Sequence, residues 1–291
     1  MTLERLKLYA ELVRLNRPIG IYLLLWPTLW ALWFASKGVP DIKILFIFAA
    51  GVALMRSAGC AINDYADRDI DLHVARTKDR PITSGKITPQ EALGVFAVLV
   101  CISFLLVIQL NKSTILLSVV AALLAATYPF MKRYHYFPQV HLGAAFAWAI
   151  PMAYTAITQN PPPLDAWLLF AAALLWTTAY DTQYGMVDRQ DDVKIGVKST
   201  AILFGKYDNF INGSLQLLSL ILITVVGILN QRGLIFNTSI LIAAGLVIYQ
   251  QHLTKDRVPE QCLKAFLNNN WLGLVIFIGI ALDFLVTSRP H

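Results

Sequence analysis

Aspartates gather in two short segments of a chain that is otherwise poor in charge. The first segment places Asn63, Asp67 and Asp71 four residues apart, on one side of an α-helix. The second places Asp188 and Asp192 at the same spacing. Like charges at this spacing repel each other, so each group needs a compensating cation. Carboxylate and amide oxygens are ligands that Mg²⁺ or Ca²⁺ prefers, whereas zinc and copper favour histidine or thiolate.

Further charged residues accompany both segments. Asp64 lies on the same side of its helix as Asp67 and is expected to support the cluster, and Asp181 lies two turns before Asp188. Basic residues follow each segment. Mg²⁺ commonly takes one or two carboxylates and completes its coordination with phosphate oxygens and water. Two matched groups therefore predict paired cations that hold one diphosphate, with the basic residues as further phosphate ligands. Solvated loop acids balanced by loop bases are the simpler interpretation, which suits a single such motif better than two.

The rest of the chain is apolar, with 57% hydrophobic and 14% charged residues. An average soluble protein carries roughly 25% charged residues. Uncharged runs of about twenty residues indicate helices that cross a bilayer. We expect one all-α, polytopic domain over residues 1–291, with about nine transmembrane helices. The expected spans are residues 18–36, 43–62, 88–110, 114–131, 138–158, 164–186, 209–230, 233–253 and 266–286.

The basic residues predict how the bundle is oriented. Most of the 24 lysines and arginines fall in the N-terminal segment and in alternate connections, which indicates the cytoplasmic side. Both acidic segments end on that side, the N-terminus is cytoplasmic, and residues 1–17 are expected to form an interfacial amphipathic helix. The net charge of +6 reflects this bias and does not indicate nucleic-acid binding. Asp283, in the last span, is expected to be solvated near the outer interface.

These motifs resemble the UbiA superfamily of intramembrane prenyltransferases. The likeness rests on N-D-x-x-D-x-x-x-D at residues 63–71 and D-x-x-x-D at 188–192. It extends from residue 17 to about 205 through "RPITSGKIT", "YPFMKRY" and "YDTQYGMVDRQDDVKIGVKSTAILFG". It is strongest for bacterial inner-membrane members that prenylate 4-hydroxybenzoate in ubiquinone biosynthesis, whereas the last three spans carry little specific signal.

The resemblance implies a reaction and a metal. A polyprenyl group would pass from its diphosphate to the ring carbon ortho to the hydroxyl of 4-hydroxybenzoate, with release of diphosphate, in a central cytoplasm-facing cavity. Mg²⁺ would be the cofactor. Its expected ligands are Asn63, Asp67, Asp71, Asp188 and Asp192, with Asp191 as an alternative to Asp192.

The resemblance also implies roles for other side chains. Arg133 is expected to bind the carboxylate of the acceptor, and Asp188 or Asp191 to help deprotonate its phenol. The expected diphosphate contacts are Arg17, Arg68, Arg76, Tyr128 and Lys132.

Two alternatives remain at this point. The first is a UbiA-type enzyme with another acceptor, such as homogentisate, dihydroxynaphthoate or haem. The second is an ion-coupled transporter, because intramembrane aspartates also bind Na⁺ or protons. Transporters hold such acids near the bilayer midplane, whereas both clusters here fall at cytoplasmic helix ends, among basic residues. This placement favours the prenyltransferase.

Overall fold

A computed structural model describes residues 3–74 and 76–287, and no β-strand occurs within these two ranges. The predicted all-α fold is confirmed. In chain order the helices are α1 (Leu3–Leu12), α2 (Ile19–Ser36), α3 (Ile42–Asp71), α4 (Pro89–Val107), α5 (Lys112–Thr127), η1 (Tyr128–Phe130), α6 (Met131–Tyr134), α7 (Pro138–Ala147), α8 (Ala149–Thr158), α9 (Leu164–Lys194), α10 (Thr200–Phe204), η2 (Gly205–Tyr207), α11 (Asp208–Leu229), α12 (Leu234–Thr254) and α13 (Pro259–Thr287).

Each of the nine predicted spans is helical over most of its length in the structure. Eight helical segments of the described chain are long and apolar enough to cross a membrane. The exception is α9, which is 31 residues long but has an apolar stretch interrupted by threonines, tyrosines and Asp181. The count of nine crossings therefore stays a prediction. The span predicted at 138–158 is divided into α7 and α8, because Pro151 has no N–H to donate to the carbonyl one turn earlier.

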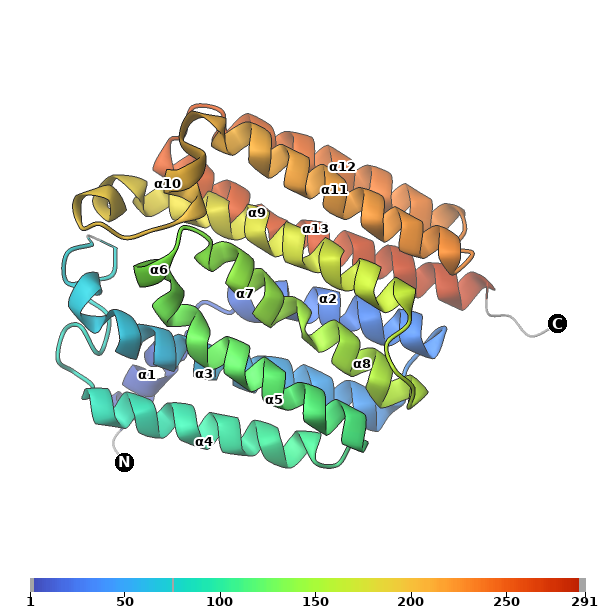
Figure 1. Ribbon diagram of the computed structural model, residues 1–291, viewed down its shortest axis with the longest axis horizontal. Coiled ribbons are helices and arrows are strands. Elements are labelled where there is room, and N and C mark those ends of the chain that lie inside the picture. The colour runs from blue at the N-terminus through green and yellow to red at the C-terminus, as the bar shows by residue number, and fades with distance from the viewer. Residues whose placement is uncertain (1–2, 75, 288–291) are drawn as a thin grey trace.

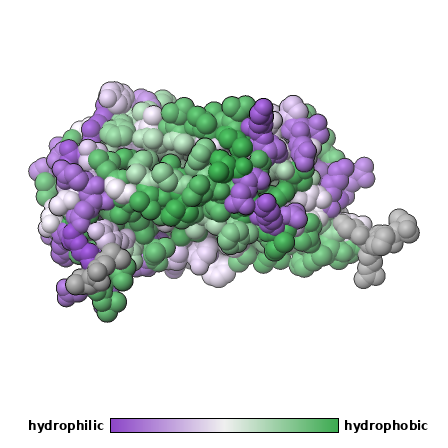
Figure 2. Space-filling view, turned by 90° about the horizontal axis from the view of Figure 1, so that it is seen from below, coloured by the Kyte–Doolittle hydropathy of each residue, from purple (hydrophilic) through white to green (hydrophobic). Residues whose placement is uncertain are grey.

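The long helices run side by side in alternating directions (Figure 1). α12 packs against α13, and α11 packs against α9. α2 contacts α8 and α13, while α3 and α4 form a pair on the other side of the bundle. Figure 2 shows hydrophobic residues over the middle of one face and hydrophilic residues toward its two ends. This distribution suits a bundle whose middle lies in lipid.

Helices α3 and α9 extend beyond the predicted spans, to Asp71 and Lys194. The acidic segments therefore form the last turns of these two helices. Both helices end at the same end of the molecule, where α1 and residues 76–88 also lie (Figure 1). Leu12 of α1 is buried there with Ala61 and Ile87, so the N-terminal helix packs directly against the elements that carry the first acidic segment.

Three consecutive asparagines of α13 connect it to three neighbouring helices. Asn270 accepts a hydrogen bond of 3.0 Å from Trp26 Nε1 on α2. Asn269 accepts one of 2.8 Å from Trp176 Nε1 and donates one of 3.0 Å to Gln183, both on α9. Asn268 accepts one of 2.9 Å from Gln250 on α12. One turn of α13 therefore fixes the positions of α2, α9 and α12.

The prediction for Asp283 is wrong. Its side chain is 2% exposed and accepts hydrogen bonds from the backbone N–H groups of Gly233 and Phe236. Arg232 lies 3.5 Å away. Because the first N–H groups of a helix have no partner within that helix, this buried carboxylate from α13 caps the start of α12. The spacing of residues within α13 could not reveal a partner on another helix.

Candidate active site

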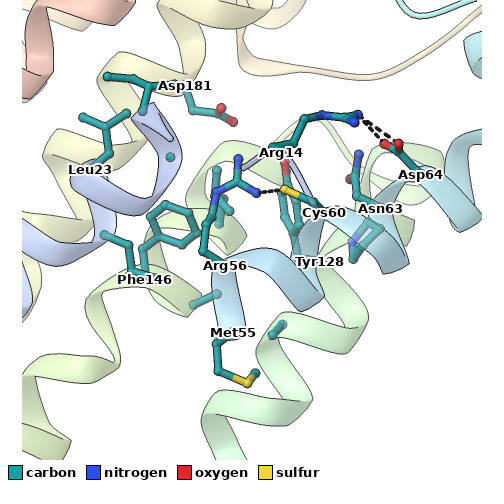
Figure 3. A pocket seen from close by; sticks show the side chains of 18 of the residues that line it. Arg14, Leu23, Met55, Arg56, Cys60, Asn63, Asp64, Tyr128, Phe146 and Asp181 are labelled. Carbon is teal, nitrogen blue, oxygen red and sulfur yellow. Dashed lines mark hydrogen bonds and ion pairs between the residues drawn. The ribbon is translucent and has the colours of Figure 1, made fainter. Parts of the chain in front are cut away.

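A cavity of about 1200 Å³ extends from the acidic ends of α3 and α9 into the bundle. Apolar side chains line much of its wall, among them Phe48 and Val52 of α3, Val107 of α4 and Phe146 of α7. Figure 3 shows Phe146 in this wall. The predicted metal ligands Asn63, Asp67, Asp71, Asp188 and Asp192 all line the cavity. The structure therefore brings the two acidic segments together at one cavity.

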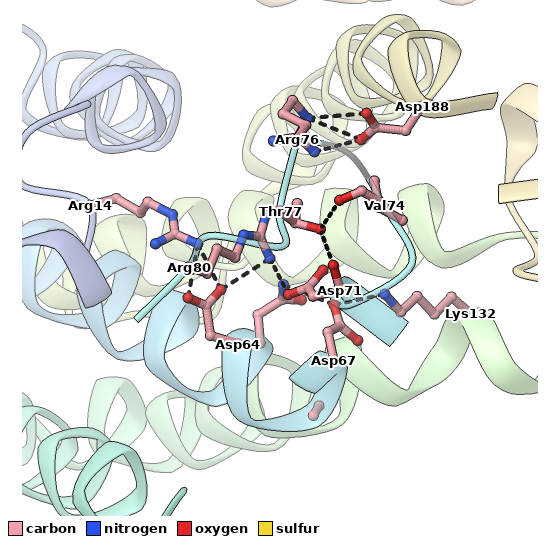
Figure 4. A network of polar contacts seen from close by, with 12 residues as sticks. Arg14, Asp64, Asp67, Asp71, Val74, Arg76, Thr77, Arg80, Lys132 and Asp188 are labelled. Atoms are coloured by element: carbon pink, nitrogen blue, oxygen red, sulfur yellow. Dashed lines mark hydrogen bonds and ion pairs between the residues drawn. The ribbon is translucent and has the colours of Figure 1, made fainter. Parts of the chain in front are cut away.

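Basic side chains neutralise the first acidic segment (Figure 4). Lys132 Nζ lies 2.7 Å from Asp67 Oδ2, to which Asn63 Nδ2 also donates a hydrogen bond of 3.1 Å. Arg80 Nη1 lies 2.7 Å from Asp71 Oδ2 and 3.1 Å from Asp64 Oδ1.

Asp64 has a second basic partner. Arg14, just after α1, donates to both of its carboxylate oxygens, at 2.7 and 2.9 Å. Asp64 is thus held between two guanidinium groups, while Asp67 and Asp71 each have one basic partner among the described residues. This arrangement suits a supporting role for Asp64.

The second acidic segment is joined to the connection after α3. Arg76 donates from Nε and Nη2 to the carboxylate of Asp188, with Nε 3.1 Å from Oδ1, and its guanidinium lies 4.8 Å from the centre of the Tyr184 ring. Asp192 forms no ion pair with the described residues, and burial followed by the charge of Asp188 raises its pKa to about 6. Arg76 therefore links the end of α9 to the segment that follows the other acids.

The chemistry of these side chains fits Mg²⁺. The donors are hard oxygens, and the Oδ1 atom of Asp67 is buried without a hydrogen-bond partner among the described residues. No group of three or more His, Cys, Asp or Glu side chains in the described part of the chain is arranged to hold a metal ion. Each cluster instead offers two carboxylates, a set that Mg²⁺ completes with phosphate oxygens and water. The site therefore fits a cation that arrives together with a diphosphate.

The other predicted site residues divide into two groups. Arg17, Arg76, Tyr128 and Lys132 line the cavity, as predicted diphosphate contacts should. Three residues are not among those that line it: Arg68, Arg133 and Asp191.

Those three side chains have partners elsewhere. Arg68 donates to the Tyr65 carbonyl at 2.8 Å, and Arg133 donates to the Ala66 carbonyl. Asp191 pairs with Lys194 at 3.2 Å. The geometry therefore gives no support to acceptor binding by Arg133 or to proton removal by Asp191.

Two ionisable residues in the deeper part of the cavity, Arg56 and Asp181, had no predicted role. Arg56 of α3 lies in the deeper part, where its guanidinium contacts the Cys60 thiol and its Nε atom is buried without a partner among the described residues. Asp181 of α9 points into the same part (Figure 3). An ionisable side chain within a predicted span is itself a sign of function, because an unpaired charge there is costly. This signal was present in the sequence for both residues.

Known proteins align with nearly the whole chain. It is 58% identical to a 4-hydroxybenzoate octaprenyltransferase of Hahella chejuensis, covering 97% of this chain and 93% of the relative. It is 56% identical to a protein of the same name from Escherichia fergusonii, covering 98% of each.

Solved structures share the fold. The structure of a UbiA homologue from Aeropyrum pernix K1 matches with a TM-score of 0.79 and 27% identity, over 91% of this chain and 97% of the other. A UbiA homologue from Archaeoglobus fulgidus bound to GPP and Mg²⁺ matches with a TM-score of 0.67 and 20% identity, over 97% and 100%. Residues 24–275 also match the model of one protein family. Taken with the site geometry, these matches lead to one conclusion: the chain belongs to the UbiA prenyltransferase family.

Proposed function

We propose that this chain transfers a polyprenyl group from its diphosphate to the ring carbon ortho to the hydroxyl of 4-hydroxybenzoate, in ubiquinone biosynthesis. The 58% identity with an octaprenyltransferase for this acceptor supports the reaction and the substrates. The observation that carries the proposal is the shared cavity at the acidic ends of α3 and α9. Two carboxylate pairs surrounded by Lys132, Arg76 and Arg80 suit a diphosphate better than a monovalent ion. This favours the prenyltransferase over the transporter.

The diphosphate of the donor would bind between the two acidic segments. Mg²⁺ held by Asn63, Asp67 and Asp71, and by Asp188 and Asp192, would neutralise the charge that develops on the leaving group. Lys132, Arg76 and Arg80 already lie against these carboxylates. They are therefore within a side-chain movement of any phosphate bound there.

The prenyl chain would occupy the apolar part of the cavity. Residues of α3, α4, α5 and α7 line this part. Few residues of α4 and α5 are buried, so the outer sides of these two helices face away from the protein. Such a wall excludes water from the allylic cation, so the acceptor ring is the nucleophile available to it. The wall also separates the prenyl chain from lipid by a single layer of helices.

The acceptor carboxylate would bind Arg56, which we propose in place of Arg133. Arg56 lines the cavity and forms no ion pair with any described residue, whereas Arg133 is absent from the cavity lining. A guanidinium can bind a carboxylate through two parallel hydrogen bonds. An anionic acceptor would thus supply the partner that Arg56 lacks.

We further propose that the chain acts as a single domain, with its N-terminus and active site on the cytoplasmic side of the inner membrane. Lys78, Arg80, Lys86 and Lys198 lie in the connections at the acidic end of the bundle. Such a basic bias marks the cytoplasmic side. Fusion of a reporter enzyme to either terminus would test this orientation.

An acceptor assay tests the reaction. Membranes containing the protein would be incubated with Mg²⁺, a polyprenyl diphosphate and, in separate reactions, 4-hydroxybenzoate, homogentisate, dihydroxynaphthoate or haem. We expect product with 4-hydroxybenzoate, complete loss of product with excess EDTA, and recovery when Mg²⁺ is restored. Product with homogentisate and none with 4-hydroxybenzoate would show that the acceptor is wrong. Turnover that survives thorough chelation would show that the metal is wrong.

A further inference from the structure

Helices α3 and α9, which carry Arg56 and Asp181, run toward the same end of the molecule (Figure 1). Arg56 precedes Asn63 by seven residues on α3, and Asp181 precedes Asp188 by seven residues on α9. Seven helical residues rise by roughly 10 Å. Both side chains therefore lie roughly that much deeper in the cavity than the acids expected to hold the diphosphate.

The Asp181 carboxylate has no hydrogen bond or ion pair with any residue in the ranges 3–74 and 76–287. It points into the cavity in the same region as the guanidinium of Arg56 (Figure 3). Tyr128 and Tyr180 line the same cavity. An aspartate in a membrane helix costs about 2.5–3.5 kcal/mol on insertion scales, so one without a partner calls for a functional explanation.

The other acids that line the cavity are unsuited to act as a base near the acceptor ring. Asp64, Asp67, Asp71 and Asp188 are each paired with a lysine or arginine. Asp192 lies at the outer end of the second segment, and Glu11 and Asp79 are exposed to solvent. Among the described cavity residues, Asp181 is thus the unpaired carboxylate in the deeper part.

We propose that Asp181 accepts the proton that leaves the acceptor ring, an inference that rests on the proposed function. The C–O bond of the donor breaks and its electron pair stays on the diphosphate. A π-electron pair of the ring forms the new C–C bond. The C–H bond at that carbon then breaks, its electron pair restores the aromatic ring, and the proton passes to a carboxylate oxygen of Asp181. Asp181 releases the proton to water or to the departing diphosphate as the products leave.

Depth in the cavity suits this role. With the diphosphate at the helix ends, the allylic carbon extends inward, and the ring must meet it below the acids. A group that removes the proton must lie within hydrogen-bond reach of the reacting carbon or one water away. Arg56 and Asp181 are both at that depth. Arg56 would hold the acceptor carboxylate, while Asp181 is available to the ring.

The test uses the full-length protein in membranes, geranyl diphosphate, and 4-hydroxybenzoate deuterated at both carbons ortho to the hydroxyl. Loss of a catalytic base typically lowers turnover by roughly 10²–10⁴-fold. We expect Asp181→Asn to lower kcat in this range with little change in KM for the donor. We also expect a primary deuterium isotope effect on kcat that the unchanged protein lacks, because proton removal becomes the slow step. Asp181→Glu, which keeps a carboxylate, should recover part of the activity.

Asp165→Asn is the matched control. Asp165 is on the same helix but outside the cavity lining, where it accepts hydrogen bonds of 3.1 Å from Tyr154 and Asn230. It should show no isotope effect. If Asp181→Asn has no measurable turnover, the isotope effect is measured on Asp181→Glu, where we also expect one.

Three outcomes separate the interpretations. Absence of an isotope effect in both Asp181 variants would overturn the proposal. A change confined to KM for the acceptor would also overturn it, because Asp181 would then only balance the charge of Arg56. If the unchanged protein makes no prenylated 4-hydroxybenzoate, the proposed function itself fails, a result distinct from the other two.

Discussion

Lys132 Nζ lies 2.7 Å from Asp67 Oδ2, so an ammonium group already contacts the carboxylate that we expect to bind a metal ion. Arg80 forms an ion pair with Asp71 in the same way, and Arg76 forms one with Asp188. Buried carboxylates are costly without a counter-charge, and these basic side chains supply it before substrate binds. Binding of a metal–diphosphate complex would then exchange partners, with cations on the carboxylates and basic side chains on the phosphates.

Substitution of a single acid in either segment should sharply lower prenyl transfer. We expect Asp67→Ala and Asp188→Ala each to lower turnover by about 10²–10³-fold or more, because charge on the leaving diphosphate is no longer neutralised. Membrane insertion should be unaffected. Radiolabelled prenyl transfer, normalised to protein in the membrane, is the measurement. Asp69→Ala is the control, since this neighbouring side chain is 78% exposed; near-normal turnover in either test variant would contradict the metal sites.

Substitution of Arg56 and of Arg133 should have different effects on the KM for the acceptor. Hydrogen bonds to charged groups contribute about 1.5–3 kcal/mol, so Arg56→Ala should raise KM for 4-hydroxybenzoate by roughly 10–100-fold. Arg133→Ala should change it much less, because its guanidinium bonds to the Ala66 carbonyl. Steady-state kinetics with each substrate varied in turn would measure both effects. The opposite ranking would return the acceptor site to Arg133.

Asp208 should stabilise the folded protein through ion pairs close to the active site. It is 0% exposed at the start of α11 and pairs with Arg189 and Arg257. Asp208→Asn leaves two arginines without their partner, a change that typically costs 3–5 kcal/mol in a buried pair. We expect a lower midpoint of thermal unfolding in detergent.

Turnover should also fall in this variant, because Arg189 adjoins Asp188 on α9. The matched control is Asp256→Asn, whose side chain is 72% exposed. Equal melting behaviour of the two variants would contradict a structural role for Asp208.

Close packing of α12 and α13 depends on a glycine. A Cβ atom on Gly279 would overlap the side chain of Ser239, whereas one on Gly245 would meet nothing within 4 Å. Small residues allow membrane helices to approach closely, and overpacking costs about 1–3 kcal/mol. Gly279→Ala should therefore destabilise the protein in a detergent melt, and Gly245→Ala should not. A neutral Gly279→Ala would indicate that the two helices can move apart freely.

Local periodicity was enough to predict the acidic surfaces of α3 and α9, because residues four apart share a side of any helix. It could not predict directions that depend on how helices meet. Lys132 and Arg133 are neighbours, yet successive helical residues point about 100° apart. Lys132 therefore meets Asp67 while Arg133 meets a backbone carbonyl.

Contacts between distant segments were equally hidden. Arg14 reaches Asp64 across fifty residues, and nothing in either segment specifies the other. Each of Arg56 and Asp181 was visible in the sequence as a charge within an apolar span. That the two residues lie at the same depth in the cavity follows only from how α3 and α9 are aligned.

The asparagine turn of α13 has a consequence for how the chain matures. The proposed reaction residues all precede residue 193, so a ribosome has made the full set long before it reaches Asn268. Until that turn is inserted, Trp26, Trp176 and Gln250 lack their hydrogen-bond partners on α13. A chain that stops before α13 would contain all the proposed reaction residues but lack the helix that holds α2, α9 and α12 in place. We expect membrane proteases to degrade such a chain.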